Sequence, residues 1–211
     1  MVKVYDIQRV NDGLFFLLPD KKDPSKTITL PRYQKFLEAI SEGKKWANLL
    51  EVRTVGELNK SIINGKISNI IKIQEALHEK KISEIAQTIK DKKAKVVLIS
   101  GPSSSGKTTF AKKLEIHLRV LGLKPYTIST DNYFVDRDKT PLKENGNPDY
   151  DSINSIDYKL LQMHINKLIS GEEVDIPKYN FVTGKKEKGR KIYLNSNGLV
   201  IVEGIHGLNP I

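Results

Sequence analysis

Cysteine is absent from the sequence, and long hydrophobic runs are absent too; each absence excludes a class of protein. Without cysteine, no disulfide framework of the kind found in small secreted domains can form. The longest apolar runs have about half a dozen residues, whereas a membrane-spanning helix needs roughly twenty. The N-terminal segment MVKVYDIQRV lacks the apolar core of a secretory signal. We therefore expect a cytoplasmic protein that does not span a membrane.

Aromatic residues are also scarce, at 7% of the chain with a single tryptophan, and this bears on the meaning of the positive charge. The 35 lysines and arginines outnumber the 25 aspartates and glutamates, which gives a net charge of +10. Such a balance favours a polyanionic partner: nucleic acid, membrane phosphates or phosphorylated small molecules. The densest lysine patches, at 90–95 and 185–191, contain no aromatic residue that could stack on a base, so we interpret both as solvated surfaces.

The first 92 residues carry the pattern of a small α+β module. Two strand-like runs, 4–10 and 14–18, flank the turn signal Asn11-Asp12-Gly13 and predict a hairpin. Helical patterns follow, two with recognisable end signals and a third with an apolar residue at every third or fourth position. The predicted helices are a short one after Pro31 that ends near Gly43, one that begins at the capping box of Thr54 and Glu57 and stops at Gly65, and a long one over residues 68–90.

From residue 93 onward, strands alternate with helices. This alternation indicates a parallel sheet with helical crossovers. We therefore predict an α/β protein with an N-terminal module over residues 1–92 and a second domain over residues 93–211. In the second domain, strands are predicted at 95–100, 125–129 and 199–202, helices at 107–121 and 156–169, and a smaller strand pair at 174–181 and 191–194 around a turn at Gly184.

A phosphate-binding loop is the strongest motif in the sequence. The pattern G-x-x-x-x-G-K-[ST] is met by residues 101–108, which follow an apolar strand and open an amphipathic helix. Its glycines let successive backbone N–H groups point inward around a phosphate, and the helix N-terminus adds partial positive charge. Lys107 can reach the β- and γ-phosphates, and the Thr108 hydroxyl can ligate Mg²⁺. The residues expected to contact the nucleotide are Gly101, Pro102, Ser103, Ser104, Ser105, Gly106, Lys107, Thr108 and Thr109.

Two acidic residues follow predicted strands and could complete the chemistry of this loop. Glu203 ends the apolar run 199–202, where a phosphate-loop protein usually supplies a carboxylate to Mg²⁺ or to its waters. Asp131 follows the strand at 125–129. If that strand lies beside the phosphate-loop strand, the Asp131 carboxylate reaches the same edge as Lys107 and could accept a proton from an attacking hydroxyl or contact the metal. An Asx turn or a helix cap is the alternative for Asp131.

Five segments together resemble the uridine/cytidine kinase branch of the phosphate-loop kinases, which includes phosphoribulokinase. They are GPSSSGKTTFAKKL from 101, STDNYF from 129, NPDYDSINSID from 147, IPKYNFVTGKK from 176 and LVIVEGIHG from 199. The resemblance covers about residues 95–211 and implies a parallel-sheet phosphate-loop fold with Mg²⁺-dependent γ-phosphoryl transfer from ATP or GTP. It also implies roles for single residues: Asp131 as general base, Thr108, Asp131 and Glu203 around the metal, Asp151 at the ribose hydroxyls, and Tyr179 beside the base.

The sequence departs from this family in two places. Thr183-Gly184-Lys185 stands where the uridine/cytidine kinases have a histidine that reads the pyrimidine edge, which leaves pyrimidine specificity open. The family also continues past the Glu203 strand with a lid whose arginines neutralise the transferring phosphoryl group, so the predicted kinase core is incomplete at its C-terminus. The N-terminal module, including LPRY from 30 and EALHEKKI from 75, resembles the threonyl-tRNA synthetase-like region that precedes the kinase in some bacterial nucleoside kinases.

These observations favour a nucleoside kinase that uses ATP or GTP and Mg²⁺ to phosphorylate the 5′-hydroxyl of a uridine-like nucleoside. Two alternatives stay open. One is a nucleotide-sensing module associated with RNA or tRNA, which the net charge of +10 and the synthetase-like front end would suit. The other is a sugar-phosphate kinase like phosphoribulokinase. The sequence does not decide the acceptor, the choice of ATP or GTP, or whether the protein is a homo-oligomer.

Overall fold

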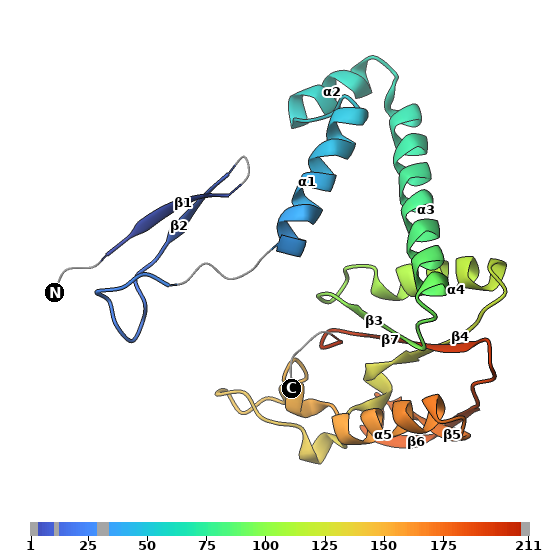
Figure 1. The fold of residues 1–211 in the computed structure, drawn as a ribbon. Helices are drawn as coiled ribbons and strands as arrows, with labels where there is room; N and C mark the ends of the chain where they lie inside the picture. The colour runs from blue at the N-terminus through green and yellow to red at the C-terminus, as the bar shows by residue number, and fades with distance from the viewer. Residues whose placement is uncertain (1–3, 11–12, 29–33, 208–211) are drawn as a thin grey trace. The chain divides into compact units, whose positions relative to one another are not determined.

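The computed structural model describes residues 4–10, 13–28 and 34–207, and Figure 1 traces the chain through them. The chain divides into two compact units, Met1–Gln74 and Glu75–Ile211. The division falls inside helix α3 (Ile67–Asp91), so each unit contains part of that helix. The predicted domain boundary between residues 92 and 93 stays a prediction. In the described part of the chain, no helix combines the length and the apolar character that a membrane span requires.

The first unit contains the predicted hairpin. Strands β1 (Asp6–Val10) and β2 (Gly13–Leu17) pair antiparallel, with Ile7 opposite Phe16. The turn residues Asn11 and Asp12 lie outside the described residues. Helix α1 (Gln34–Leu49) runs past Gly43, where the sequence predicted its end. A glycine inside a helix costs only about 1 kcal/mol relative to alanine, so it weakens a helix without having to terminate it.

The end signals of the next two helices are confirmed. Helix α2 (Val55–Ile63) begins at a capping box, in which the Glu57 backbone N–H donates to the Thr54 hydroxyl and the Thr54 N–H donates to the Glu57 carboxylate, both at 3.2 Å. Gly65 follows the helix with a φ of 70°, a left-handed conformation that glycine adopts without strain. Helix α3 then begins at Ile67, within a residue of the predicted start.

The second unit is built on a parallel sheet of three strands. Its order is β3 (Val96–Ser100), β7 (Gly198–Gly204) and β4 (Lys124–Ser129), with β7 in the middle. The strand that precedes Asp131 therefore lies beside β7, and the prediction that it could lie beside the phosphate-loop strand is wrong. Every residue of β7 is buried, as expected for a strand covered on both faces.

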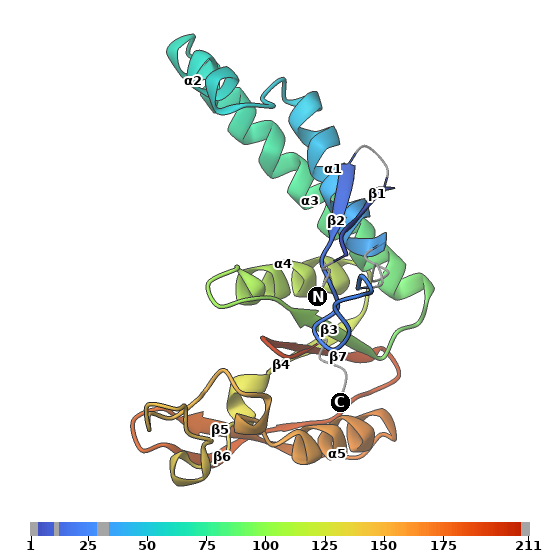
Figure 2. The ribbon, with the colours of Figure 1, turned by 90° about the vertical axis from the view of Figure 1, so that its left-hand side faces the viewer.

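Two hydrophobic cores cover the two faces of this sheet. Figure 2 shows the helix labelled α4 on one side of the sheet and the elements labelled α5, β5 and β6 on the other. Because side chains alternate along a strand, Leu199 and Ile201 of β7 enter one core while Val200 and Val202 enter the other. The first core is closed by helix α4 (Lys107–Val120) and by the end of α3. The second is closed by helix α5 (Tyr158–Ile169) and by the antiparallel pair β5 (Val174–Asn180) and β6 (Lys185–Ile192).

Two boundaries in this unit differ from the prediction, and both have local causes. Strand β6 occupies 185–192 rather than 191–194, because it pairs along the whole of β5, from Lys185 opposite Asn180 to Ile192 opposite Val174. Helix α5 begins two residues later than predicted, because the Asp157 carboxylate caps it by accepting from the Leu160 N–H at 3.1 Å. Short 3₁₀ turns, η1 (Thr130–Tyr133), η2 (Arg137–Lys139) and η3 (Ile153–Ser155), connect β4 to α5.

Candidate active site

The carboxyl ends of the three parallel strands meet at one edge of the sheet. Ser100 at the end of β3 pairs with Gly204 of β7, and Ser129 at the end of β4 pairs with Glu203. The Ser100 hydroxyl also donates to the carbonyl of Ile205 at 3.0 Å, which ties the start of the phosphate loop to the end of β7. The loop, Glu203 and the turn that carries Asp131 therefore leave the sheet side by side, where open α/β sheets bind ligands.

The phosphate loop has the backbone conformation that its glycines allow. Gly106 has a φ of 83° and is the N-cap of α4, and Ser104 has a φ of 60°. Because Gly106 has no side chain, no side-chain cap satisfies the first N–H groups of α4. Those N–H groups and the helix dipole are available to an anion. A Cβ at Gly101 would lie 2.9 Å from the Ser105 hydroxyl, so the turn into the loop is also tight.

The ammonium group of Lys107 lies over the phosphate loop. Its Nζ donates to the Pro102 carbonyl oxygen at 2.7 Å, so the side chain folds back across the loop that it follows. An ammonium group on a flexible stem can exchange this neutral carbonyl for a charged phosphate oxygen. The position therefore suits the role that the sequence predicted for Lys107.

Three of the predicted metal and catalytic groups come together beside the loop. The Thr108 hydroxyl and the buried Glu203 carboxylate lie 3.4 Å apart. Burial raises the pKa of Asp131, the negative charge of Glu203 raises it further, and the positive charge of Lys107 opposes both. Asp131 therefore lies within electrostatic reach of Glu203 and Lys107. Two carboxylates that repel each other beside a hydroxyl fit Mg²⁺, which is usually held by one or two carboxylates with phosphates and waters.

The turn that carries Asp131 is fixed by its neighbours. The Asp131 backbone N–H donates a hydrogen bond to the Ser129 hydroxyl at 3.3 Å, which restrains the backbone at this residue. Two residues on, the buried Tyr133 hydroxyl lies 3.0 Å from Nδ1 of His164 on α5. A Cβ at Gly204 would lie 1.9 Å from the Thr130 hydroxyl oxygen, so η1 packs directly against the end of β7. Sequence reasoning missed Tyr133 and His164, since nothing in their spacing indicates that they meet.

The two predicted substrate residues lie in different surroundings. The ring of Tyr179 is buried and packs against Phe134 and Phe181, with centroid distances of 5.5 and 5.1 Å. Asp151 is exposed, and its carboxylate accepts from the Lys143 ammonium at 3.3 Å. Its neighbour Tyr150 meets Phe134 edge to face at 5.7 Å, which brings the 150–151 segment to the same aromatic cluster. The cluster adjoins the candidate active site, because the Phe134 N–H donates to the Asp131 carbonyl.

Comparison with known proteins gives the family of the second unit. Residues 96–209, more than half of the chain, match the phosphoribulokinase / uridine kinase family. The chain belongs to this family. The matched residues begin at β3 and include the phosphate loop, η1, the β5–β6 pair and β7. The N-terminal module lies outside them, so its resemblance to the synthetase-like region stays a prediction.

Several known proteins are similar to parts of this chain. A uridine kinase of Halobacterium salinarum is 30% identical over 111 residues, which are 53% of this chain and 48% of that protein. A uridine kinase of Mycoplasma genitalium is 34% identical over 115 residues, 54% of this chain and 53% of that protein. A solved structure of a possible uridine kinase from Bacillus stearothermophilus, 27% identical, covers 59% of this chain and 70% of its own chain with a TM-score of 0.50. The chain spans about half the length of the uridine kinases it matches.

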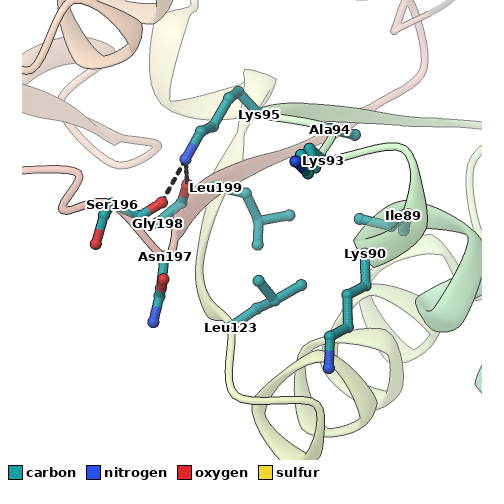
Figure 3. A pocket seen from close by; sticks show the side chains of 10 residues that line it. All are labelled: Ile89, Lys90, Lys93, Ala94, Lys95, Leu123, Ser196, Asn197, Gly198 and Leu199. Atoms are coloured by element: carbon teal, nitrogen blue, oxygen red, sulfur yellow. Dashed lines mark hydrogen bonds between the residues drawn. The ribbon is translucent and has the colours of Figure 1, made fainter.

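The second unit also contains a cavity at the opposite edge of the parallel sheet, where the strands begin (Figure 3). It has a volume of about 360 Å³, with Leu123 and Leu199 among its apolar lining. The Lys95 ammonium crosses its edge and donates to the carbonyls of Ser196, at 2.6 Å, and Gly198, at 3.2 Å. Lys95 therefore holds the loop that leads into β7. None of the residues of the phosphate loop lines this cavity.

Proposed function

We propose that the protein is a nucleoside kinase, which transfers the γ-phosphoryl group of ATP or GTP to the 5′-hydroxyl of a nucleoside. The observation that carries the proposal is the contact of the Glu203 carboxylate with the Thr108 hydroxyl at 3.4 Å, at the sheet edge where the strand before Asp131 also ends. The Glu203 charge contributes to the raised pKa of Asp131, which agrees with this arrangement. Membership of the phosphoribulokinase / uridine kinase family supports it. The uridine kinases that match this chain support a nucleoside as the acceptor.

In this proposal the loop and Lys107 bind the triphosphate. Backbone N–H groups of residues 101–108 and the N-terminus of α4 surround its phosphates, with Thr109 in the first turn of the helix. The Lys107 ammonium leaves the Pro102 carbonyl and stabilises the charge that spreads over the transferred group. These interactions need no movement of the sheet, because the loop already has its left-handed residues at Ser104 and Gly106.

Asp131 acts on the acceptor. Its carboxylate orients the attacking hydroxyl and takes its proton, and a raised pKa makes it a stronger base than an ordinary aspartate. Thr108, Asp131 and Glu203 would hold Mg²⁺. When bound, this ion would supply positive charge to the phosphate oxygens. Tyr179 and Asp151 are proposed to contact the base and the ribose of the acceptor.

The test is a panel of acceptors with an isosteric variant at Asp131. Wild type and Asp131→Asn are mixed with ATP or GTP, Mg²⁺ and either nucleosides or sugar phosphates, and acceptor-dependent ADP or GDP release is measured. We expect release with nucleosides and a loss of roughly 10²- to 10⁴-fold in Asp131→Asn, with ATP binding retained. Asp138→Asn, an exposed aspartate in η2, is the matched control. Because the chain spans half the length of its relatives, the assay also uses the longest reading frame that contains it.

Other results would favour another function or exclude Asp131 as the base. Turnover with sugar phosphates alone would favour phosphoribulokinase-like chemistry. RNA affinity that falls steeply with salt, without turnover on any acceptor, would favour the nucleotide-sensing module. A normal rate in Asp131→Asn would exclude Asp131 as the base.

A further inference from the structure

The aromatic cluster beside η1 contains a buried polar group. The Tyr179 side chain is only 3% exposed, and its hydroxyl forms no hydrogen bond of good geometry among the described residues, although the Arg137 guanidinium is close enough to act on it. A buried hydroxyl left unpaired costs about 1–3 kcal/mol, which a bound ligand can recover. Phe181, in contact with the Tyr179 ring, is 61% exposed and offers an open aromatic surface. The cluster therefore has both an aromatic face and an unpaired hydroxyl for a planar ligand.

Arg137 is attached to the turn that closes this cluster. Its backbone N–H donates to the Gly184 carbonyl at 2.8 Å, and its guanidinium donates to the carbonyl oxygens of Phe181 and Val182. Burial is the main cause of the raised pKa of Tyr179, and Arg137 acts against it, so the guanidinium charge reaches the Tyr179 hydroxyl. The side chain of Arg137 is nonetheless exposed, which leaves it accessible to a ligand.

Gly184 makes room for this arginine. A Cβ at Gly184 would lie 2.7 Å from Cβ and 2.8 Å from Nε of Arg137, closer than real side chains approach. Gly184 also has a φ of 69°, which a larger residue adopts only with strain. The arginine thus occupies the space above residue 184, in the segment where related kinases are expected to place a histidine and this sequence has none.

From these contacts we infer that Arg137 reads the edge of the acceptor's ring and selects a ring carbonyl. The inference rests on the proposed function and narrows its substrate class. A guanidinium carries five N–H donors and no acceptor, and the two backbone carbonyls leave donors unused. An exocyclic carbonyl can accept from it, whereas an exocyclic amine presents hydrogen to hydrogen. The site therefore favours the oxo member of each related pair: uridine over cytidine, and inosine over adenosine.

The experiment compares binding of the four nucleosides by calorimetry to the chain and its variants. We expect wild type to bind uridine and inosine roughly 10- to 100-fold more tightly than cytidine and adenosine, the usual effect of a hydrogen bond from a charged donor. In Arg137→Ala, affinity for the oxo nucleosides should fall to that of the amino nucleosides, which should change little. Gly184→Ala should lose the same preference, because its methyl group displaces the guanidinium. Lys139→Ala, in the same turn, is the control that should retain it.

Other results would overturn the inference in recognisable ways. An oxo-to-amino ratio that survives Arg137→Ala would exclude Arg137 as the selecting group while leaving the nucleoside kinase intact. An equal loss for all four nucleosides in Arg137→Ala, with an unchanged thermal melt, would assign Arg137 to general binding rather than to selection. No binding of any nucleoside, either to this chain or to the longest reading frame that contains it, would overturn both this inference and the proposed function.

Discussion

The Thr108 hydroxyl lies 3.4 Å from Oε2 of Glu203, although 95 residues separate them in the chain. The contact joins the first turn of α4 to the end of β7, and it exists because β3 and β7 are hydrogen-bonded neighbours. Glu203 also raises the pKa of Asp131 on its other side. One buried glutamate thus connects the phosphate loop to the candidate base.

Glu203→Gln should lower the pKa of Asp131. The Glu203 charge is the second largest cause of its upward shift, so removing that charge while keeping the shape leaves burial and Lys107 as the opposing influences. The measurement is an NMR titration of the Asp131 carboxyl carbon in both proteins. Glu144→Gln, at an exposed position, should leave the titration unchanged. An unchanged midpoint in Glu203→Gln would mean that the two carboxylates do not interact.

Gly204→Ala should destabilise the second unit by about 1–3 kcal/mol, the usual cost of forcing a methyl group into a filled space. The added Cβ would lie 1.9 Å from the Thr130 hydroxyl oxygen. The single tryptophan, Trp46, lies on α1 in the first unit, so its fluorescence would not report on β7. Hydrogen exchange of the β7 amides is therefore the measurement. Thr130→Ala in the same chain should recover part of the loss, since it removes that hydroxyl. Additive losses in the double variant would show that the two residues do not touch.

His164 should make the second unit less stable as the pH falls below about 6.5. Burial is the main cause of its lowered pKa, with Lys167 acting in the same direction and Asp157 and Asp175 acting against it. The unfolded chain, with an ordinary pKa of 6.5, therefore binds a proton before the folded protein does, and stability is lost as the pH falls towards the folded value. His164→Asn keeps a polar partner for Tyr133 without the titration. The stability difference between wild type and His164→Asn should shrink or reverse from pH 8 to pH 5.5; a constant difference would contradict the assignment.

Lys95→Met should loosen the loop before β7. It removes two hydrogen bonds to the carbonyls of Ser196 and Gly198, each worth about 0.5–1.5 kcal/mol at most in so exposed a position. Faster hydrogen exchange at residues 196–198 is the expected result. Lys90→Met, which alters another lysine of the same cavity, is the control. Equal effects of the two substitutions would show that the loss of charge, rather than of the two bonds, is responsible.

The local features of the candidate site were predictable because their determinants are contiguous. The phosphate loop is one stretch of eight residues between a strand and a helix, and the capping box of Thr54 is a four-residue pattern. Placing Asp131 and Glu203 at one edge needed only the rule that parallel strands end together. Strand order was different: nothing in residues 124–129 distinguishes β3 from β7 as a neighbour, since both are short apolar strands.

Side-chain contacts between residues far apart in the sequence could not be predicted from the sequence pattern. The hydrogen bond of Tyr133 with His164 and the close approach of the Arg137 side chain to Gly184 depend on how 3₁₀ turns fold against α5 and β5. Glycine at 184 and the missing histidine were visible in the sequence. They indicated that this segment differs from the related kinases. No periodicity indicated that Arg137, 47 residues earlier, occupies the space beside Gly184.

Among the three described strands of the parallel sheet, the middle one comes last in the sequence. Strands β3 and β4 each pair with β7 and with no other described strand, so within the described residues neither has a neighbouring strand until residues 198–204 have left the ribosome. Until then, the apolar residues of β3 and β4 and the core-facing side of α4 are exposed, which favours aggregation. Pairing across about a hundred residues should accordingly be slow, and the candidate active site should form only when β7 joins β3 and β4.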